Sequence, residues 1–495
     1  MAEFQLLGGS SAVDLGGGYK LRAPGLKGTV RVHGPKALGT RGPELSSSAF
    51  DQVLRNAGID EVTAIELNVQ STPAPASTVP IRGADGADAF ELQAPDFGPD
   101  YGQVVLSIDE AGAMHWHFPL ENDLSFQTSA VRGANGCKIF RIPRAVATPP
   151  LAADTEKRGL VSMIGSKILK VLVYPVADAV LGPLTQLAVG KWEDRKRPYG
   201  LRRFLPDDRS PLTPADWSRL AQGRALLFVH GTFSTSQAGF GDLPAGTLQE
   251  LAGRYGNRVF AFDHPTLSVD PEANAKWFYA QLPAELALDV DIICHSRGGL
   301  LSRCMGGMSS QFGVEPSRFK IKRLVLAGVP NQGTLLAHPD HMVEFLDRMT
   351  TALNIFPGNT VSEVLEAILT VVKIIGHAGL TSLAGLAAMK PGNPLLVKLQ
   401  QSPVPGCTVY GIGADFEPTG AGLAAAFCKA ADSLLDRVFN EAPNDLVVPA
   451  DGMRAWGAVE IPANQFLSYP PGKGVMHTSY FSQAETSAKL LDWLR

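Results

Sequence analysis

The sequence has 495 residues, of which 45% are hydrophobic and 19% charged, and its formal net charge is −4 at pH 7. This composition excludes an intrinsically disordered or collagen-like chain, and without a basic excess nothing indicates a nucleic-acid partner. Five widely spaced cysteines argue against a disulfide framework and favour a reducing compartment. Because the N-terminus lacks a signal-peptide pattern and no long apolar run is uninterrupted, we expect a cytoplasmic protein without a transmembrane segment.

The first 135 residues have a hydropathy pattern typical of a β-rich domain. Residues 62–69 and 102–108 alternate apolar and polar side chains, the pattern of half-buried strands. His115 and His117 flank Trp116 at strand spacing, and without further ligands nearby in sequence we interpret them as strand-surface residues rather than a metal site. The sequence therefore predicts an N-terminal β-rich domain over 1–135, whose role it does not indicate.

Residues 136–221 are expected to form a helical connector. The apolar stretch 159–190 is interpreted as helix interrupted at Pro175 and Pro183. The charged run 192–197 that follows is interpreted as the solvated end of a helix.

After residue 221 the pattern changes to alternating strands and helices. Helix-compatible segments such as 271–286 and 297–310 separate the apolar runs, which are 225–229, 258–262, 290–294, 323–327 and 407–412. Strands buried on both faces that alternate with helices indicate a mostly parallel sheet with helices on each side. We therefore predict an α/β fold for residues 222–495.

A candidate nucleophile lies where one of these strands ends. In the segment Cys-His-Ser-Arg-Gly-Gly (294–299), Ser296 stands between the strand at 290–294 and a helix. A serine on such a sharp turn is lifted clear of the backbone, provided that the residues two before and two after it are small. Gly298 meets this need, whereas Cys294 replaces the usual glycine. The alternative is that Ser296 merely caps the helix.

Three further loops fit the same chemistry. Thr232 follows His-Gly at the end of the first core strand, where its backbone N–H, together with that of Arg297, can face a developing oxyanion. Asp445 lies in Asn-Asp-Leu-Val-Val-Pro (444–449), and His477 lies near the C-terminus. The chain order serine, aspartate, histidine is that of an α/β-hydrolase.

Residues 222–495 resemble the α/β-hydrolase superfamily on its lipase and esterase side. Five segments carry the resemblance in the expected order: 229–233, 294–299, 328–334, 388–396 and 444–449. The resemblance implies an esterase or lipase-like serine hydrolase whose catalytic triad is Ser296, Asp445 and His477. It also implies an oxyanion hole at Thr232 and Arg297, with the Thr232 hydroxyl as an additional donor. Neither a metal nor an organic cofactor is needed.

The expected substrate is a small-molecule or lipid ester, and the oligomeric state stays unknown. The same triad also serves serine peptidases, amidases and acyltransferases. A function of another class is a non-catalytic interaction protein that binds through its N-terminal β region. An intact triad argues against that last alternative.

Asp415 is an alternative acid, because it directly follows the strand at 407–412. We prefer Asp445 because its Asn-Asp-x-Val-Val-Pro context is the more specific match.

An insertion over about 335–402 is expected to form a helical cap beside Ser296. Within it, apolar residues from Val361 to Ile375, including Ile368, recur at three- and four-residue intervals and give one apolar face. Either this face covers the sheet as ordinary core, or Ile368 and Phe233 line an acyl-binding surface.

Overall fold

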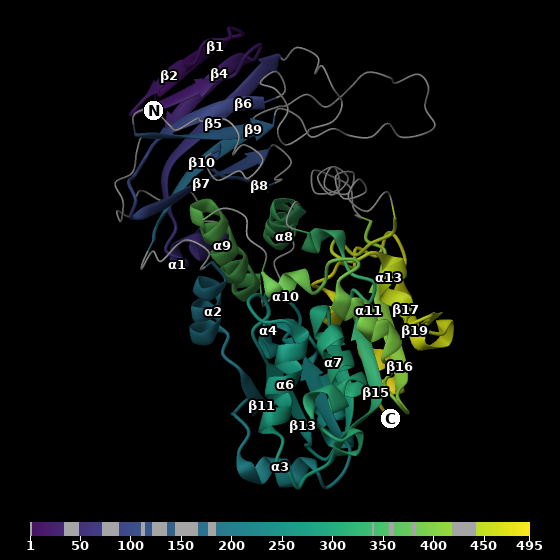
Figure 1. Cartoon of the computed structure of the whole chain (residues 1–495). Helices are drawn as coiled ribbons and strands as arrows, with labels where there is room; N and C mark the ends of the chain where they lie inside the picture. The colour runs from purple at the N-terminus through teal and green to yellow at the C-terminus, as the bar shows by residue number, and fades with distance from the viewer. Residues whose placement is uncertain are drawn as a thin grey trace, which may run out of the picture.

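The computed structural model describes residues 2–33, 49–71, 89–109, 114–120, 136–143, 167–176, 185–338, 341–355, 361–378, 383–417 and 442–495. Two sheets near the N-terminus lie at one end of the molecule and a seven-stranded sheet at the other, with helices α8 (Met342–Ile355) and α9 (Val361–Ala378) between them (Figure 1).

The N-terminal strands form a two-sheet sandwich. The larger sheet has the order β1 (Ala2–Leu7), β4 (Lys27–His33), β5 (Asp60–Ser71), β10 (Lys167–Pro175), β7 (Tyr101–Asp109) and β8 (Met114–His117). The smaller sheet is β2 (Val13–Gly16), β3 (Tyr19–Arg22), β6 (Ala89–Pro95) and β9 (Cys137–Pro143). Side chains from both sheets share one hydrophobic core. In the described part of the chain, none of these strands joins the seven-stranded sheet.

Strand β7 is buried on both faces, which differs from the predicted half-buried strand at 102–108. Val105 belongs to the core between the two N-terminal sheets, whereas Val104 and Leu106 belong to the core shared with α8 and α9. Alternation places successive side chains on opposite faces, but it does not indicate that a helix covers the second face.

The predicted helical connector is wrong over two segments. Residues 137–143 and 167–175 are the strands β9 and β10, and β10 pairs with both β5 and β7. Leu169, Val171 and Val173 face the sandwich core, as alternate residues of a strand do. The described helices before the seven-stranded sheet are α1 (Ala49–Asn56) and α2 (Thr185–Lys196).

The seven-stranded sheet confirms the predicted α/β class. Its order is β11 (Gly200–Arg203), β13 (Val259–Asp263), β12 (Ala225–Val229), β14 (Leu288–His295), β15 (Phe319–Ala327), β16 (Thr408–Ala414) and β19 (Phe466–Tyr469). Only β11 pairs antiparallel with its neighbour. The five predicted apolar runs are the strands β12 to β16.

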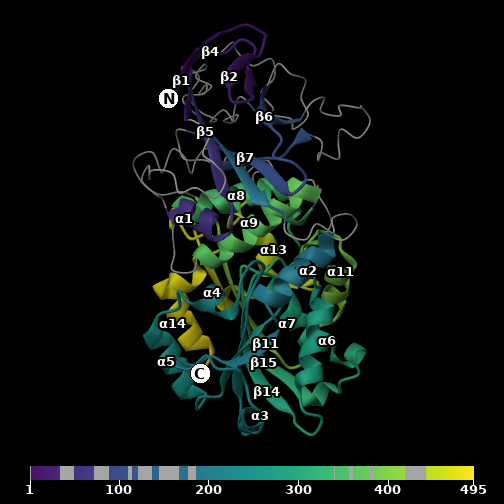
Figure 2. The same cartoon turned by 90° about the vertical axis from the view of Figure 1, so that its left-hand side faces the viewer.

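Helices cover both faces of this sheet (Figure 2). One face packs on α6 (Pro271–Gln281) and α7 (Arg297–Gly307), and the other packs on α5 (Ala245–Arg254) and α14 (Ala484–Trp493). Side chains alternate between the two faces; for example, Leu227 and Val229 belong to the first core and Leu226 and Phe228 to the second.

The remaining described elements lie around the sheet. The shorter helices are α3 (Pro214–Leu220), α4 (Ser236–Phe240), α10 (Ala384–Ala387), α11 (Pro394–Gln401) and α13 (Ala450–Arg454), and the strands β17 (Ala455–Trp456) and β18 (Val459–Glu460) pair with each other. Among the described helices, none has both the length and the hydropathy to cross a bilayer.

Candidate active site

Ser296 occupies a strained turn between β14 and α7. Its φ is +52° and its ψ is −131°, a conformation rare for a residue with a side chain. The backbone N–H of Ser296 donates to the carbonyl oxygen of Ala327 on the neighbouring strand (2.8 Å), which ties the turn to the sheet. The turn therefore has the geometry predicted for a nucleophile elbow.

The small residues on either side of the turn are required by close packing. A Cβ atom on Gly298 would lie 2.4 Å from the carbonyl oxygen of Val229 and 2.5 Å from that of His230. Cys294 is fully buried, and its Sγ lies 3.2 Å from the carbonyl oxygen of Val325. Cysteine is thus accommodated where the motif usually has glycine.

Asp445 and His477 form a buried pair. Nδ1 of His477 lies 2.7 Å from Oδ2 of Asp445, and the backbone N–H of His477 donates to the Asp445 carbonyl oxygen (2.9 Å). The other carboxylate oxygen, Oδ1, accepts from the backbone N–H groups of Val447 (3.1 Å) and Val448 (2.8 Å). The Asp445 side chain has no exposed area, so these donors replace water around its negative charge.

Tyr480 completes the surroundings of this carboxylate, and sequence reasoning missed it. Its hydroxyl group donates to Oδ2 of Asp445 (2.7 Å), and burial together with the adjacent carboxylate raises the pKa of the Tyr480 phenol well above 10.0. Tyr480 lies only three residues after His477, but nothing local in the sequence indicates that its hydroxyl group turns toward Asp445.

His295 contacts His477 from the other side. Its Nε2 donates to the carbonyl oxygen of His477 (2.8 Å), and the two rings lie 4.8 Å apart. Burial, with a smaller effect from His477, lowers the pKa of His295 to about 3, so the ring stays neutral at physiological pH. His295 therefore fixes the backbone at His477.

Asp415 is not part of this cluster. It follows β16, where its backbone N–H donates to the carbonyl oxygen of Tyr469 (3.0 Å). Burial raises the pKa of its carboxyl group, an effect that a hydrogen bond with the backbone of Asn444 partly offsets. The carboxylate that contacts His477 is that of Asp445.

The loop after β12 lies against the nucleophile turn. A Cβ atom on Gly231 would lie 2.7 Å from the Cβ of Ser296, so only glycine allows this approach. The next residue, Thr232, lines the same cavity as Ser296, and its Oγ1 lies 3.8 Å from Sδ of Met389. The backbone N–H of Phe233, whose φ is +60°, donates to Oγ1 of Thr266 (3.3 Å). The Phe233 amide is therefore already engaged by Thr266.

A buried glutamate on α2 fixes the loop that holds Phe233. Oε1 of Glu193 accepts from the backbone N–H groups of Thr266 (2.6 Å) and Leu267 (2.9 Å), and Oε2 accepts from the Ser268 backbone N–H (2.8 Å). Glu193 is only 1% exposed, so the interpretation of 192–197 as a solvated helix end is wrong at this residue. Charge alone could not indicate this contact, because the residues it joins are more than 70 positions apart.

Arg297 has a structural side chain and an available amide. Its guanidinium is buried and donates to the carbonyl oxygens of Gly385 (3.1 Å) and Val269. Its backbone N–H belongs to the first turn of α7, where helical amides have no partner within the helix. The same residue therefore anchors the loop 266–269 and offers a donor beside Ser296.

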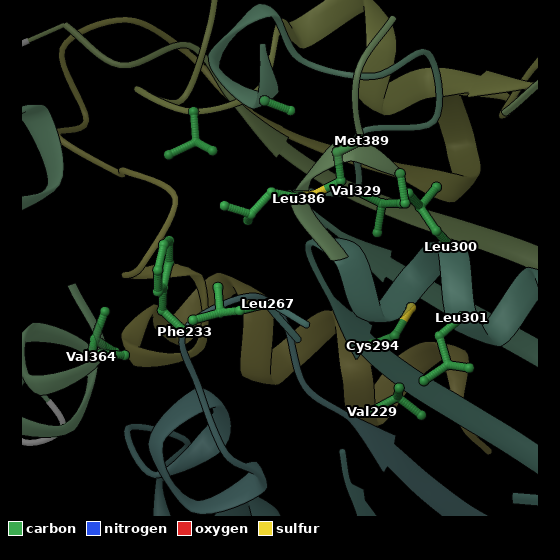
Figure 3. Close-up of a cluster of buried hydrophobic side chains, with 14 of the residues drawn as sticks. Val229, Phe233, Leu267, Cys294, Leu300, Leu301, Val329, Val364, Leu386 and Met389 are labelled. Carbon is green, nitrogen blue, oxygen red and sulfur yellow. The ribbon is translucent and has the colours of Figure 1, made fainter. Parts of the chain in front are cut away.

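Ser296 and His477 line one cavity of about 520 Å³ with Thr232 and Phe233. Its apolar lining includes Phe233, Val364, Leu386 and Met389, which Figure 3 shows in the buried cluster. Ile368 does not line the cavity: its side chain is fully buried in the core that α9 shares with the N-terminal sheet. Of the two predicted substrate-contact residues, the structure brings only Phe233 to Ser296.

A family model described as "Domain of unknown function (DUF7379)" matches residues 196–495. No curated protein matches the chain. Among solved structures, lipase 1 from Pelosinus fermentans is 12% identical with a TM-score of 0.36, covering 54% of this chain and 97% of its own. The phospholipase PlaB from Legionella pneumophila is 16% identical with a TM-score of 0.32, covering 47% and 45%. The hydrolase olei00960 from Oleispira antarctica is 12% identical with a TM-score of 0.34, covering 62% and 97%. Similarity at this level carries no information on substrate.

Proposed function

We propose that this chain, which belongs to the family described as Domain of unknown function (DUF7379), is a serine hydrolase that cleaves carboxylic esters through an acyl-enzyme on Ser296. The observation that carries the proposal is the meeting of three distant segments at one cavity. Ser296 on its strained turn and the Asp445-bound His477 both face that cavity, although about 180 positions separate them. A structural serine has no need of a positive φ or of a buried acid–base pair beside it.

Acylation begins with proton transfer. Nε2 of His477 takes the proton of the Ser296 hydroxyl group while Oγ attacks the ester carbonyl carbon. The carbonyl oxygen becomes an oxyanion, which the backbone N–H groups of Thr232 and Arg297 stabilise. The tetrahedral intermediate then expels the alcohol, which leaves with the proton from His477.

Deacylation repeats these steps with water in place of the serine. His477 takes a proton from water as it attacks the acyl carbon, and the carboxylic acid leaves as the proton returns to Ser296 Oγ. Asp445 holds the His477 ring with Nε2 directed away from it and stabilises the imidazolium in both halves of the cycle. The amides of Val447 and Val448 and the hydroxyl group of Tyr480 keep that carboxylate in place.

The proposal is tested by hydrolysis of p-nitrophenyl esters beside the corresponding p-nitroanilides. We expect ester turnover, and we expect Ser296→Ala and His477→Ala each to remove nearly all of it, because members of a triad act as a unit. Ser310→Ala, at an exposed serine, is the matched control and should keep full turnover. Turnover that survives Ser296→Ala would refute the assignment, and faster cleavage of anilides than of esters would favour an amidase.

A further inference from the structure

Helix α8 forms one wall of the cavity. Met342, Phe345, Met349 and Leu353 all line it, and their spacing of three and four residues places them in one stripe along the helix. Phe345 stacks on Phe233 of the loop after β12, with ring centroids 5.5 Å apart and planes inclined by 24°. The position of α8 therefore decides how far the cavity extends beyond the reacting centre.

A different face of α8 is bound to the N-terminal sandwich. Asp347, Thr350 and Thr351 lie off the cavity-lining stripe. At about 100° per residue, Asp347 and Thr351 point to nearly the opposite side of the helix and Thr350 to its flank. All three are buried, and all three contact strand β8. The helix thus joins the cavity to the N-terminal sheet.

The contact with β8 uses the open edge of the larger N-terminal sheet. Among the described strands, β8 ends the sheet order and has β7 as its one neighbour. On its other side, the Trp116 backbone N–H donates to Oδ1 of Asp347 (2.7 Å) and the Met114 backbone N–H donates to Oγ1 of Thr351 (3.0 Å). Helix side chains thus satisfy edge amides that would otherwise need another strand.

Two further hydrogen bonds fix the position of α8 along β8. The indole N–H of Trp116 donates to Oγ1 of Thr350 (3.0 Å), and Thr351 Oγ1 lies 3.2 Å from the Met114 carbonyl oxygen, to which it donates. Trp116 is fully buried. Removal of the Asp347 or Thr350 side chain therefore leaves a Trp116 N–H group without a hydrogen-bond acceptor. A helix held at four points by buried hydrogen bonds cannot slide along the strand without breaking several at once.

We propose that the N-terminal sheet helps to form the acyl-binding site: strand β8 fixes α8 at the depth that admits long apolar acyl chains. This inference rests on the proposed ester hydrolysis. Met349, Leu353 and Val364 form an apolar surface, whereas Asp242, Ser482 and Gln483 line the cavity as polar residues. The apolar wall takes the acyl chain, and the polar wall faces the alcohol or solvent. The sandwich acts on substrate choice without touching the substrate.

The test compares kcat/KM for p-nitrophenyl laurate with that for p-nitrophenyl butyrate. Leu353→Trp, which fills part of the apolar wall directly, should lower the laurate-to-butyrate ratio at least tenfold. Asp347→Ala, which leaves the cavity lining intact but frees β8, should lower the same ratio at least fivefold. Thr351→Val, a milder change of similar shape, keeps the test valid if Asp347→Ala fails to fold. Glu344→Gln, on the same helix but neither in the cavity lining nor bound to β8, is the control and should leave the ratio unchanged.

The outcomes separate this inference from the proposed function. If the unaltered protein hydrolyses neither ester and its serine does not react with a fluorophosphonate, the proposed function is wrong. If it hydrolyses both and Leu353→Trp lowers the ratio, but folded Asp347→Ala and Thr351→Val do not, the role of β8 is refuted. Equal loss on both esters in step with a fall in Tm would also refute it, because that result assigns the junction to stability alone.

Discussion

Gly298→Ala tests whether the nucleophile turn is packed as tightly as its geometry indicates. In an ordinary helix this change stabilises by about 1 kcal/mol, because alanine has the higher helix propensity. Here the new Cβ would lie 2.4 and 2.5 Å from two backbone carbonyl oxygens at the end of β12, and backbone cannot rotate away as a side chain can. Overpacking costs about 1–3 kcal/mol, and two clashes with backbone place this change in the upper part of that range, at about 2–3 kcal/mol. After the propensity gain is subtracted, we expect a net loss of about 1–2 kcal/mol.

The effect on turnover should exceed the effect on stability. The strand end that must move carries Gly231 and Thr232, and the helix start carries Arg297, so both oxyanion donors shift relative to Ser296. Loss of one such donor lowers kcat by about 10²–10³-fold, and we expect Gly298→Ala to reach that range.

The control is Gly253→Ala in α5, where an added Cβ meets nothing within 4 Å. It should raise stability by up to about 1 kcal/mol and leave turnover unchanged. Urea unfolding and p-nitrophenyl butyrate hydrolysis measure both quantities. If Gly298→Ala behaves like the control, the close approach of β12 to the turn is wrong, and so is the account of the oxyanion site.

Three further predictions follow from the buried polar groups. Asp445→Asn should lower kcat about 10³–10⁴-fold, whereas Asp415→Asn should change it by less than about threefold. A larger loss of kcat in Asp415→Asn than in Asp445→Asn would identify Asp415 as the acid of the triad. Glu193→Gln should lower stability by about 2–3 kcal/mol, because an amide nitrogen then faces N–H donors of the loop 266–268, whereas Asp194→Asn at its exposed neighbour should be neutral by urea unfolding. Burial lowers the pKa of His230 to about 4, that of His295 to about 3 and that of His264 well below its ordinary 6.5. The unfolded chain binds protons at these histidines below about pH 6.5, whereas the folded protein does not. Their contribution to the free energy of unfolding is therefore fully present above about pH 6.5. It should fall by up to about 1.4 kcal/mol per pH unit for each ring as the pH drops toward 4, and unfolding curves that coincide at pH 7.5 and 5.0 would contradict this.

Local signals were enough to predict five strands of the seven-stranded sheet, and the predicted residues Ser296 and His477 line one cavity. Each strand from β12 to β16 is a short apolar run, and a run of this kind is buried wherever it pairs, so its identity does not depend on distant residues. Ser296 and Asp445 lie in the short segments 294–299 and 444–449, each of which can be recognised from its own residue types. Their meeting with His477 follows from chain order and from the shared edge of a parallel sheet.

The features that sequence analysis missed are those fixed by distant partners. Strand β10 is held by pairing with β5 and β7, whose residues lie about 60 to 110 positions earlier, and its apolar content alone fits a helix equally well. Ile368 satisfies the helical pattern, but that pattern says nothing of whether the covered surface is a cavity or the N-terminal sheet. Glu193 is buried where it accepts hydrogen bonds from residues 266–268, and Tyr480 is buried where it donates to Asp445. Both partners are distant in sequence, so local composition does not indicate these contacts.

The central claim is that Ser296 is an activated nucleophile. A fluorophosphonate probe phosphonylates only such a serine, with loss of fluoride, and intact-mass measurement followed by peptide mapping locates the adduct. We predict one adduct per chain, at Ser296, which forms in Ser310→Ala, is absent in Ser296→Ala and forms far more slowly in His477→Ala. No adduct on the folded protein, or an adduct at another residue that persists in Ser296→Ala, would contradict the account.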